Sequence, residues 1–231
     1  MFILIYLAAY FVVFRDWTPK TRPEAASCMI SFFHGTPSAV LASIALFADQ
    51  NLTFSSPNTV SESLVLEFSI AYFLTDLLHY ILFYPADLLF IAHHVVTLHV
   101  LVSCRYLVAH GSYAVLFLLI LAEVTSACQN TWTLARARRE DVPFAAKLYA
   151  FITPPFYALY TIVRGVVAPV FVFKMGAFYV SGQAADGLVP KWAWISWMAV
   201  IIIALLVSIS WIYGLWCELC TEKTDKIKKK I

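Results

Sequence analysis

Charged residues are scarce in this chain of 231 residues: Asp, Glu, Lys and Arg together make up 13% of it, against about a quarter in an ordinary soluble domain. Hydrophobic residues make up 61% and aromatic residues 16%, a balance typical of a helical bundle in a membrane with aromatic side chains at both interfaces. The net charge of +2 comes mostly from clusters outside the apolar runs, so it indicates membrane topology and not a nucleic-acid-binding surface. We expect one compact, all-α membrane domain and no nucleic-acid partner.

Cysteine is also sparse, and its pattern gives little support to a metal site. Three of the five cysteines lie in or beside apolar runs, and Cys217 and Cys220 form one Cys-x-x-Cys pair. A structural zinc site needs a second pair of ligands with similar spacing, which the sequence lacks. We therefore expect no metal from this pair. Packing, or reversible acylation of a cysteine next to the membrane, are its remaining uses.

The first apolar run, residues 1–14, lacks the basic segment and the small-residue cleavage site of a signal peptide. It is also shorter than the roughly 20 residues that cross a bilayer as a helix. We expect a retained, marginal first membrane helix, followed by a basic loop, within residues 1–24.

Six longer apolar runs are each long enough to cross a bilayer. They cover residues 25–48, 64–84, 88–108, 113–134, 144–173 and 192–216. The run 144–173 contains Pro154, Pro155 and Pro169, which remove backbone donors and predict a kink. The sequence thus predicts a polytopic transmembrane bundle of about seven helices, whose last six form one domain over residues 25–216.

Lysine and arginine are distributed unevenly between the two sides of this bundle. One side carries the basic residues that follow the first, fifth and last runs: Arg15, Lys20, Arg22, Arg136, Arg138, Arg139 and the lysines of the tail. The other side carries Arg105, Lys174 and Lys191. Because short cytosolic loops are enriched in Lys and Arg, we expect a cytosolic C-terminus. The sequon Asn51-Leu52-Thr53 then falls on the lumenal side, where N-glycosylation takes place.

Residues 217–231 form a basic tail that ends in Lys228-Lys229-Lys230-Ile231. Lysines at the third and fourth positions from the C-terminus resemble the dilysine retrieval signal of endoplasmic-reticulum membrane proteins, which would be recognised by coat proteins. The alternative is a basic segment that contacts anionic lipid head groups. Both interpretations keep the tail in the cytosol.

Polar side chains interrupt the predicted helices, where each is costly against lipid. Successive runs carry Asp76 and His79; His93, His94 and Thr97; Glu123, Ser126, Asn130 and Thr133; and Tyr157, Tyr160, Thr161 and Arg164. We expect these groups to converge on an interior polar cavity that pairs or solvates them. An adjacent histidine pair oriented by a carboxylate can act as general base, nucleophile or metal ligand.

Three further polar residues have simpler interpretations. For His34 and His99 we expect ordinary hydrogen-bonded roles within the bundle. Arg164 either holds a phosphate or carboxylate, or neutralises Glu123 or Asp76, the second being the simpler role.

The order of these motifs resembles the TLC domain, a family named for TRAM, Lag and CLN proteins that includes the ceramide synthases. The resemblance is carried by Tyr72-Phe73-Leu74-Thr75-Asp76, by His93-His94-Val95-Val96-Thr97 with Ser103 beyond it, by Glu123 and Asn130, and by Thr161-Ile162-Val163-Arg164-Gly165 with Pro169. It covers most of the chain, from about residue 22 to residue 216.

In ceramide synthases the Lag motif places a histidine pair in a membrane cavity, where an acyl group passes from acyl-CoA to the amine of a sphingoid base. The resemblance implies a multi-pass protein of the endoplasmic-reticulum membrane that acts in lipid metabolism, with acyl-CoA as co-substrate, a membrane lipid or sphingoid-like acceptor, and no resident cofactor. The candidate catalytic residues are His93, His94, Asp76 and Glu123. The candidate substrate-binding residues are Arg164, Asn130, His79 and Thr97.

The sequence also departs from the ceramide synthases. Those enzymes follow the histidine pair with two closely spaced aspartates, where this chain has the single acid Glu123, and the homeobox-like insert of many animal synthases is absent. The pattern looks more like the smaller TLC-domain proteins, so a non-catalytic lipid-binding, sensing or trafficking protein stays an alternative. A haem or metal site formed by His79 with His93 or His94 is a third, and the sequence leaves a homodimer open.

Overall fold

A computed structural model gives the fold for residues 1–49, 51–183 and 187–228, with side chains described as far as residue 221. The structure is 81% helical and has no β-strand in the part of the chain that it describes, so the predicted all-α membrane bundle is confirmed. The helices are α1 (Phe2–Ala8), α2 (Arg22–Phe47), α3 (Val60–Phe83), α4 (Leu88–Val102), α5 (Ser112–Glu123), α6 (Ser126–Ala137), α7 (Pro143–Ile162), α8 (Ala168–Val180) and α9 (Lys191–Lys228). Three π-helical turns continue α1, α4 and α7: η1 (Ala9–Val13), η2 (Ser103–Val108) and η3 (Val163–Val167).

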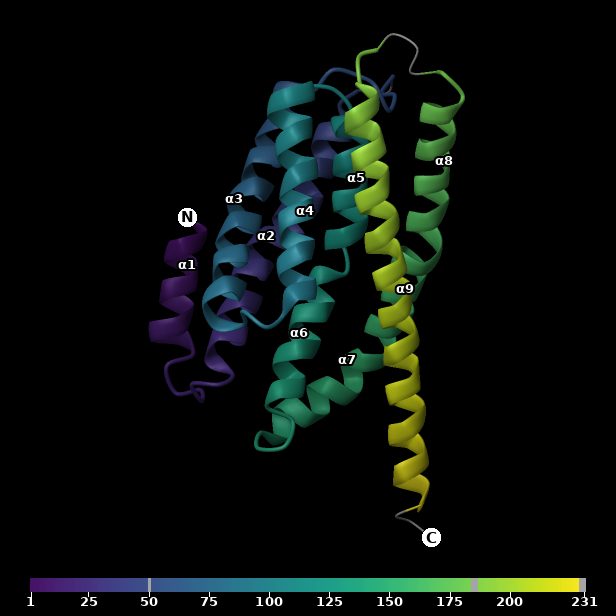
Figure 1. Ribbon diagram of the computed structural model, residues 1–231. Coiled ribbons are helices and arrows are strands. Elements are labelled where there is room, and N and C mark those ends of the chain that lie inside the picture. The colour runs from purple at the N-terminus through teal and green to yellow at the C-terminus, as the bar shows by residue number, and fades with distance from the viewer. Residues whose placement is uncertain (50, 184–186, 229–231) are drawn as a thin grey trace.

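Six helical segments are long and apolar enough to cross a membrane. They are Arg22–Phe47, Val60–Phe83, Leu88–Val108, Ser112–Ala137, Pro143–Val180 and Lys191–Thr221. In Figure 1 they stand side by side, with the described parts of three connections, 48–49 with 51–59, 109–111, and 181–183 with 187–190, at the top. The connections 14–21, 84–87 and 138–142 lie at the bottom. We call these the upper and lower ends of the bundle.

The N-terminal helix is shorter than the other membrane helices. Residues Phe2–Val13 form an apolar helix of about 18 Å, against the ~30 Å of a bilayer core. It packs beside the lower half of α3 (Figure 1), where Phe2 lies against Tyr72 and the Tyr6 hydroxyl lies 2.8 Å from His79 Nδ1. A full crossing by residues 1–14 stays a prediction, and the six longer helices form the bundle around the polar residues.

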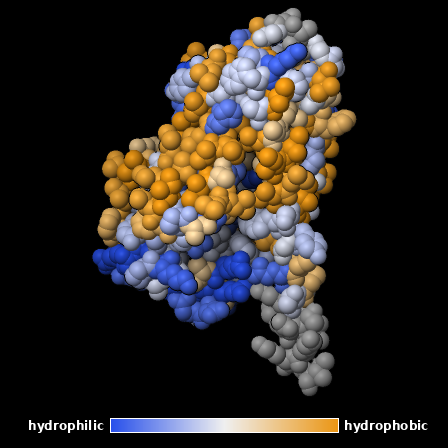
Figure 2. Space-filling view, in the orientation of Figure 1, coloured by the Kyte–Doolittle hydropathy of each residue, from blue (hydrophilic) through white to orange (hydrophobic). Residues whose placement is uncertain are grey.

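Hydropathy divides the surface into a belt and two ends. Figure 2 shows an orange apolar belt around the middle and a blue hydrophilic band at the lower end. The basic residues that precede α2 and follow α6 lie at that lower end, where a hydrogen bond from Arg138 lowers the pKa of Asp141. At the upper end Asn51 is exposed, and Arg105 pairs with Glu67 at 2.7 Å. The sequon and the basic loops therefore lie at opposite ends, as the predicted topology requires.

Two of the membrane segments are interrupted. The segment Ser112–Ala137 breaks at Val124 and Thr125, between α5 and α6. The segment Pro143–Val180 starts obliquely as α7 and stands upright by α8 (Figure 1), which agrees with the kink that its prolines predict. Both interruptions border the polar cavity described below.

Helix α9 is the least enclosed wall of the bundle. Near its upper end, Trp197 Nε1 donates a hydrogen bond of 2.8 Å to Ser103 Oγ, and Ser196 Oγ lies 3.0 Å from His99 Nε2. Near its lower end, Arg136 of α6 pairs with Glu218 at 2.8 Å. Polar contacts thus hold the upper part of α9 against α4 and η2 and its lower part against α6. The middle of α9 faces the cavity. The structure gives His99 the hydrogen-bonded role expected for it.

Candidate functional site

A cavity of about 910 Å³ lies between the six membrane segments. Its walls come from α2 to α6, from η3 and from α9, and its lower end is lined by loop residues that include Thr21, Asp87 and Glu140. A recess in the middle of the apolar belt also exposes hydrophilic surface beside α9 (Figure 2). At the lower mouth Tyr84 donates a hydrogen bond to the Lys20 carbonyl, and burial raises the pKa of Tyr84. The cavity thus opens toward the predicted cytosolic side.

All eight candidate residues line this cavity: Asp76, His79, His93, His94, Thr97, Glu123, Asn130 and Arg164. The predicted convergence of polar groups therefore holds in the structure. Proximity to one cavity does not assign chemistry, so the catalytic and substrate-binding roles of these residues stay predictions.

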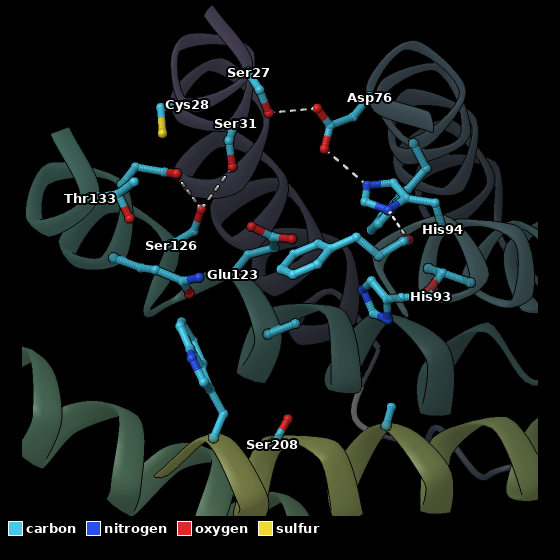
Figure 3. A pocket seen from close by; sticks show the side chains of 18 of the residues that line it. Ser27, Cys28, Ser31, Asp76, His93, His94, Glu123, Ser126, Thr133 and Ser208 are labelled. Atoms are coloured by element: carbon cyan, nitrogen blue, oxygen red, sulfur yellow. Dashed lines mark hydrogen bonds and ion pairs between the residues drawn. The ribbon is translucent and has the colours of Figure 1, made fainter. Parts of the chain in front are cut away.

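Asp76 and His94 form a buried pair on one wall of the cavity (Figure 3). His94 Nε2 lies 2.9 Å from Asp76 Oδ2, and His94 Nδ1 lies 2.8 Å from the Phe90 carbonyl oxygen. Because a carbonyl oxygen only accepts, Nδ1 carries a proton. The contact between Nε2 and the carboxyl group then holds a second proton, shared by the two side chains. Both ring nitrogens of His94 are therefore occupied.

A serine of α2 completes this arrangement. Ser27 donates a hydrogen bond of 2.7 Å to Asp76 Oδ1, so each carboxyl oxygen of Asp76 has a partner. Asp76 is held between α2 and α4, which fixes the orientation of His94.

His93 differs from His94 in its environment. Its side chain is exposed and lies on the cavity wall, where Figure 3 shows it near the open space that Glu123 also faces. The ring contacts His94 edge to face, with centroids 5.6 Å apart. Neither ring nitrogen has a hydrogen-bond partner among the residues that the structure describes. His93 is thus the histidine of the pair whose nitrogens are free for a ligand.

Glu123 ends α5 on the opposite side of this space. Its Oε1 lies 3.8 Å from Nδ1 of His34, a fully buried residue whose Nε2 lies 3.1 Å from Ser69 Oγ. His34 also stacks on Tyr72, with ring centroids 4.0 Å apart and an interplanar angle of 5°. The buried Nδ1 atom of His34 has no hydrogen-bond partner in the described chain. The structure thus gives His34 its expected hydrogen bond and also places it directly behind the acid.

Arg164 reaches the cavity from η3, a π-helical turn just before Pro169. A proline cannot donate to the preceding turn of the helix, and π-helical turns are frequent at functional sites. One guanidinium nitrogen donates a hydrogen bond of 2.8 Å to the Ala122 carbonyl, at the break between α5 and α6. The Arg164 Nε atom is buried without a hydrogen-bond partner in the described residues.

Among the described residues, Arg164 makes no direct ion pair with Asp76 or Glu123, and its hydrogen bond goes to the backbone carbonyl of Ala122. Neutralisation of either acid by Arg164 from a longer distance stays a prediction. Arg164 also lies over the Tyr160 ring, 5.3 Å from the centroid. The cavity therefore contains a guanidinium without a bonded carboxylate.

Among the described residues, the three remaining candidates line the cavity without a hydrogen bond to the pair formed by Asp76 and His94. His79 is largely buried, and its Nδ1 is taken by Tyr6 of α1. Asn130 donates a hydrogen bond of 3.1 Å to Ser126. Thr97 lines the cavity and makes no hydrogen bond to His93 or His94.

Sequence reasoning missed the polar face of α2. Ser27, Ser31, His34 and Ser38 recur at intervals of four and three residues, which places them on one face of a helix. Two of them line the cavity: Ser27 bonds Asp76, and Ser31 lies 3.4 Å from Ser126. The periodicity of these polar residues was the available signal. It is a weak signal, because serine is common in membrane helices and costs little free energy there.

Metal binding has no geometric support in the described residues. They contain no group of three or more His, Cys, Asp or Glu side chains arranged to hold a metal ion. His79 and His94 each have a ring nitrogen bonded to another side chain. The acid and histidine contacts are better explained as hydrogen-bonded pairs.

The site also requires a close approach between α2 and the break after α5. An added Cβ atom at Gly35 would lie 2.5 Å from Ser126 Oγ and 2.7 Å from both Ser126 Cβ and Glu123 Oε2. We expect Gly35→Ala to force these helices apart and to lower the free energy of unfolding by about 1–3 kcal/mol. Thermal unfolding of purified protein in detergent measures this effect.

Gly214→Ala is the matched control, because an added Cβ there has open space around it. This helical change should leave stability unchanged or raise it by up to ~1 kcal/mol. Equal melting temperatures for Gly35→Ala and the unmodified protein would contradict the close packing of Glu123.

Two comparisons with known proteins identify the family. The model of the TLC domain matches residues 24–217. The chain is also 58% identical to the TLC domain-containing protein At5g14285 of Arabidopsis thaliana, over all of this chain and 92% of that protein. No solved structure matches the chain significantly. TLC-domain proteins are generally tied to lipid metabolism, and the chain belongs to this family of multi-pass membrane proteins.

Proposed function

We propose that this protein transfers an acyl group from acyl-CoA to an amine or hydroxyl group of a lipid, as the ceramide synthases that it resembles do. The observation that carries this proposal is the contrast within the histidine pair. His93 faces the cavity with both nitrogens free, and His94 is held by Asp76 and the Phe90 carbonyl. Such an arrangement suits one reactive imidazole beside one that fixes its position.

In this mechanism His93 is the general base. It accepts the proton of the acceptor amine or hydroxyl as the acceptor's nitrogen or oxygen bonds to the acyl carbon. The carbon–sulfur bond of the thioester then breaks, and the proton passes to the departing thiolate, so that coenzyme A leaves as the free thiol. The products are an amide or ester and coenzyme A, with no oxidant or reductant needed.

Arg164 and Glu123 stabilise charge in this scheme. The guanidinium has no bonded carboxylate and would attract the developing oxyanion or an anionic head group. Glu123 and Asn130, on the facing wall, would bind the acceptor. His79 borders the polar part of the cavity, where its ring would orient a lipid head group. Thr97, one turn above His93, would contact the substrate where its chain begins.

The proposed location is the endoplasmic-reticulum membrane, with a cytosolic C-terminus. The lower mouth of the cavity lies at the end that carries the basic loops, which the distribution of Lys and Arg assigns to the cytosol. Acyl-CoA, a cytosolic compound, would approach from this side. The last three residues, Lys229, Lys230 and Ile231, lie outside the described residues; we infer recognition of the dilysine end by coat proteins from the sequence alone.

A second candidate is a non-catalytic protein that binds, senses or transports acyl lipids in the same cavity. It is favoured by one observation: a single Glu123 stands where the ceramide synthases have an aspartate pair. Incubation of purified protein with radiolabelled acyl-CoA and a panel of lipid amines and alcohols separates the two functions, because only the transferase gives a new labelled lipid.

The two histidines should respond differently to substitution. His93→Gln should keep normal abundance and melting temperature and lower acyl transfer by at least about a hundredfold, since it removes a general base from an unpartnered position. His94→Ala should instead reduce abundance, because it leaves Asp76 buried without its partner, a loss of about 3–5 kcal/mol. Transfer assays and thermal unfolding on the same preparations measure both effects.

The control for the second variant is the double change His94→Ala with Asp76→Ala, which removes both members of the pair and should recover part of the lost stability. Full transfer activity in His93→Gln would exclude His93 as the base. Labelled acyl lipid bound by the unmodified protein without any transfer would favour the second candidate.

The dilysine interpretation makes a separate prediction about the tail. Changing Lys228 and Lys229 to Ser should release the protein from the endoplasmic reticulum, because a receptor reads these two positions specifically. Moving the same two charges to earlier tail positions, Thr221→Lys and Thr224→Lys, keeps the summed charge and should not restore retention. Fluorescence microscopy of tagged protein measures this, and unchanged localisation after the double serine change would leave a lipid-contacting tail.

A further inference from the structure

The cavity has an apolar upper lobe as well as a polar lower part. Above the level of His93 and Glu123, its walls are formed almost entirely by aliphatic side chains from α4, α5 and α9. They are Val100 and Leu101; Val115, Leu118 and Leu119; and Val200, Ile201, Ala204 and Leu205, with Thr97 among them. On α4, α5 and α9, no residue that lines this lobe has an ionisable side chain. An amphiphile would therefore bind with its chain upward and its polar end at the histidines.

The upper lobe is closed at its far end. Trp197 is fully buried one turn above Val200, and its hydrogen bond to Ser103 joins α9 to η2 there. The contact between Ser196 and His99 joins α9 to α4 at the same level. An acyl chain that enters the lobe from below would therefore stop at these hydrogen-bonded side chains.

Two helices give the same depth for this lobe. The distance along the chain is eight residues from His93 to Leu101 on α4 and from Glu123 to Val115 on α5, and each of these residues lines the cavity. At about 1.5 Å per residue, the lobe reaches ~12 Å above His93 and Glu123. An extended acyl chain advances by ~1.3 Å per carbon, so about eight to ten carbons fill this depth.

We propose that the upper lobe selects medium-chain acyl groups of about eight to ten carbons, with Val115 and Val200 as the residues that set the limit. This inference rests on the proposed function, since it assumes that the cavity holds an acyl chain. Longer chains must displace the Trp197 wall, or fold back into the polar part of the cavity and toward its hydrophilic recess beside α9. Both outcomes disturb buried packing or place methylene groups against polar side chains.

Three variants change the lobe in known directions. Val115→Ala with Val200→Ala removes two branched side chains at the far end and should move the limit upward by about two carbons. Val200→Phe fills the far end and should lower the limit by a similar amount. Ile203→Phe is the matched control, because Ile203 lies on the same helix with 62% of its surface exposed toward lipid.

The experiment is a competition for the cavity in lipid nanodiscs. Saturated fatty acids of about six to eighteen carbons compete with a fluorescent medium-chain fatty acid, and concentrations are expressed as mole fractions in the lipid so that partition into the bilayer cancels. We expect similar affinities up to about ten carbons and at least tenfold weaker binding at fourteen or more. The limit should shift in the two lobe variants and stay in place in Ile203→Phe.

The outcomes separate this proposal from the function on which it rests. Saturable competition with equal affinity for all lengths, unchanged in the lobe variants, would overturn the length limit and leave a lipid-binding cavity. Absence of saturable binding at every length would overturn both proposals. A limit that shifts equally in Ile203→Phe would show that the lobe does not set it.

Discussion

The structure depends on the poor solvation that a bilayer gives to polar side chains. Each ionisable group inside a membrane helix must meet another polar group or water, because lipid offers it no partner. The pair formed by Asp76 and His94 meets this requirement most completely, since every polar atom of both side chains has a partner on α2, α3 or α4. The need to bring these atoms together fixes how the three helices pack and which faces turn inward.

The breaks in the helices have the same origin. The interruption after α5 leaves the Ala122 carbonyl available, and both Thr125 and Arg164 donate hydrogen bonds to it. Arg164 itself is brought there by the π-helical turn η3. Gly35 lets α2 approach the break closely enough to contact Glu123 and Ser126. The break after α5 and the turn η3 therefore both border the cavity, where irregular backbone in a membrane protein can be tolerated.

Some polar side chains of the cavity have hydrogen-bond partners within the protein, and others do not. His94 and Asp76 satisfy each other, whereas His93 and part of the Arg164 guanidinium do not find partners in the described chain. Free polar groups around an accessible cavity are the features that a ligand can use. The apolar lobe above them and the polar mouth below them match the lipid ligand that we propose.

The sequence was sufficient for the membrane class and most of the spans, because apolar runs of this length have few other uses. It also predicted that the candidate residues share one cavity, because polar groups are costly against lipid whatever the arrangement of the helices. It could not show that Arg164 bonds to the backbone at Ala122, because that carbonyl becomes available only through the break after α5. The roles of Tyr6 and Ser27 depend on contacts between helices distant in the chain, which one sequence does not reveal.

The central claim is that the cavity holds an acyl chain with its polar end at His93 and its tail in the upper lobe. Photo-crosslinking with two medium-chain fatty acids, one with a diazirine next to the carboxyl group and one with it at the chain end, tests this claim most directly. Mass spectrometry of the labelled peptides should place the first label near His93 or Glu123 and the second near Leu101, Val115 or Val200. Labels from both probes confined to lipid-facing residues such as Ile203 would contradict the account.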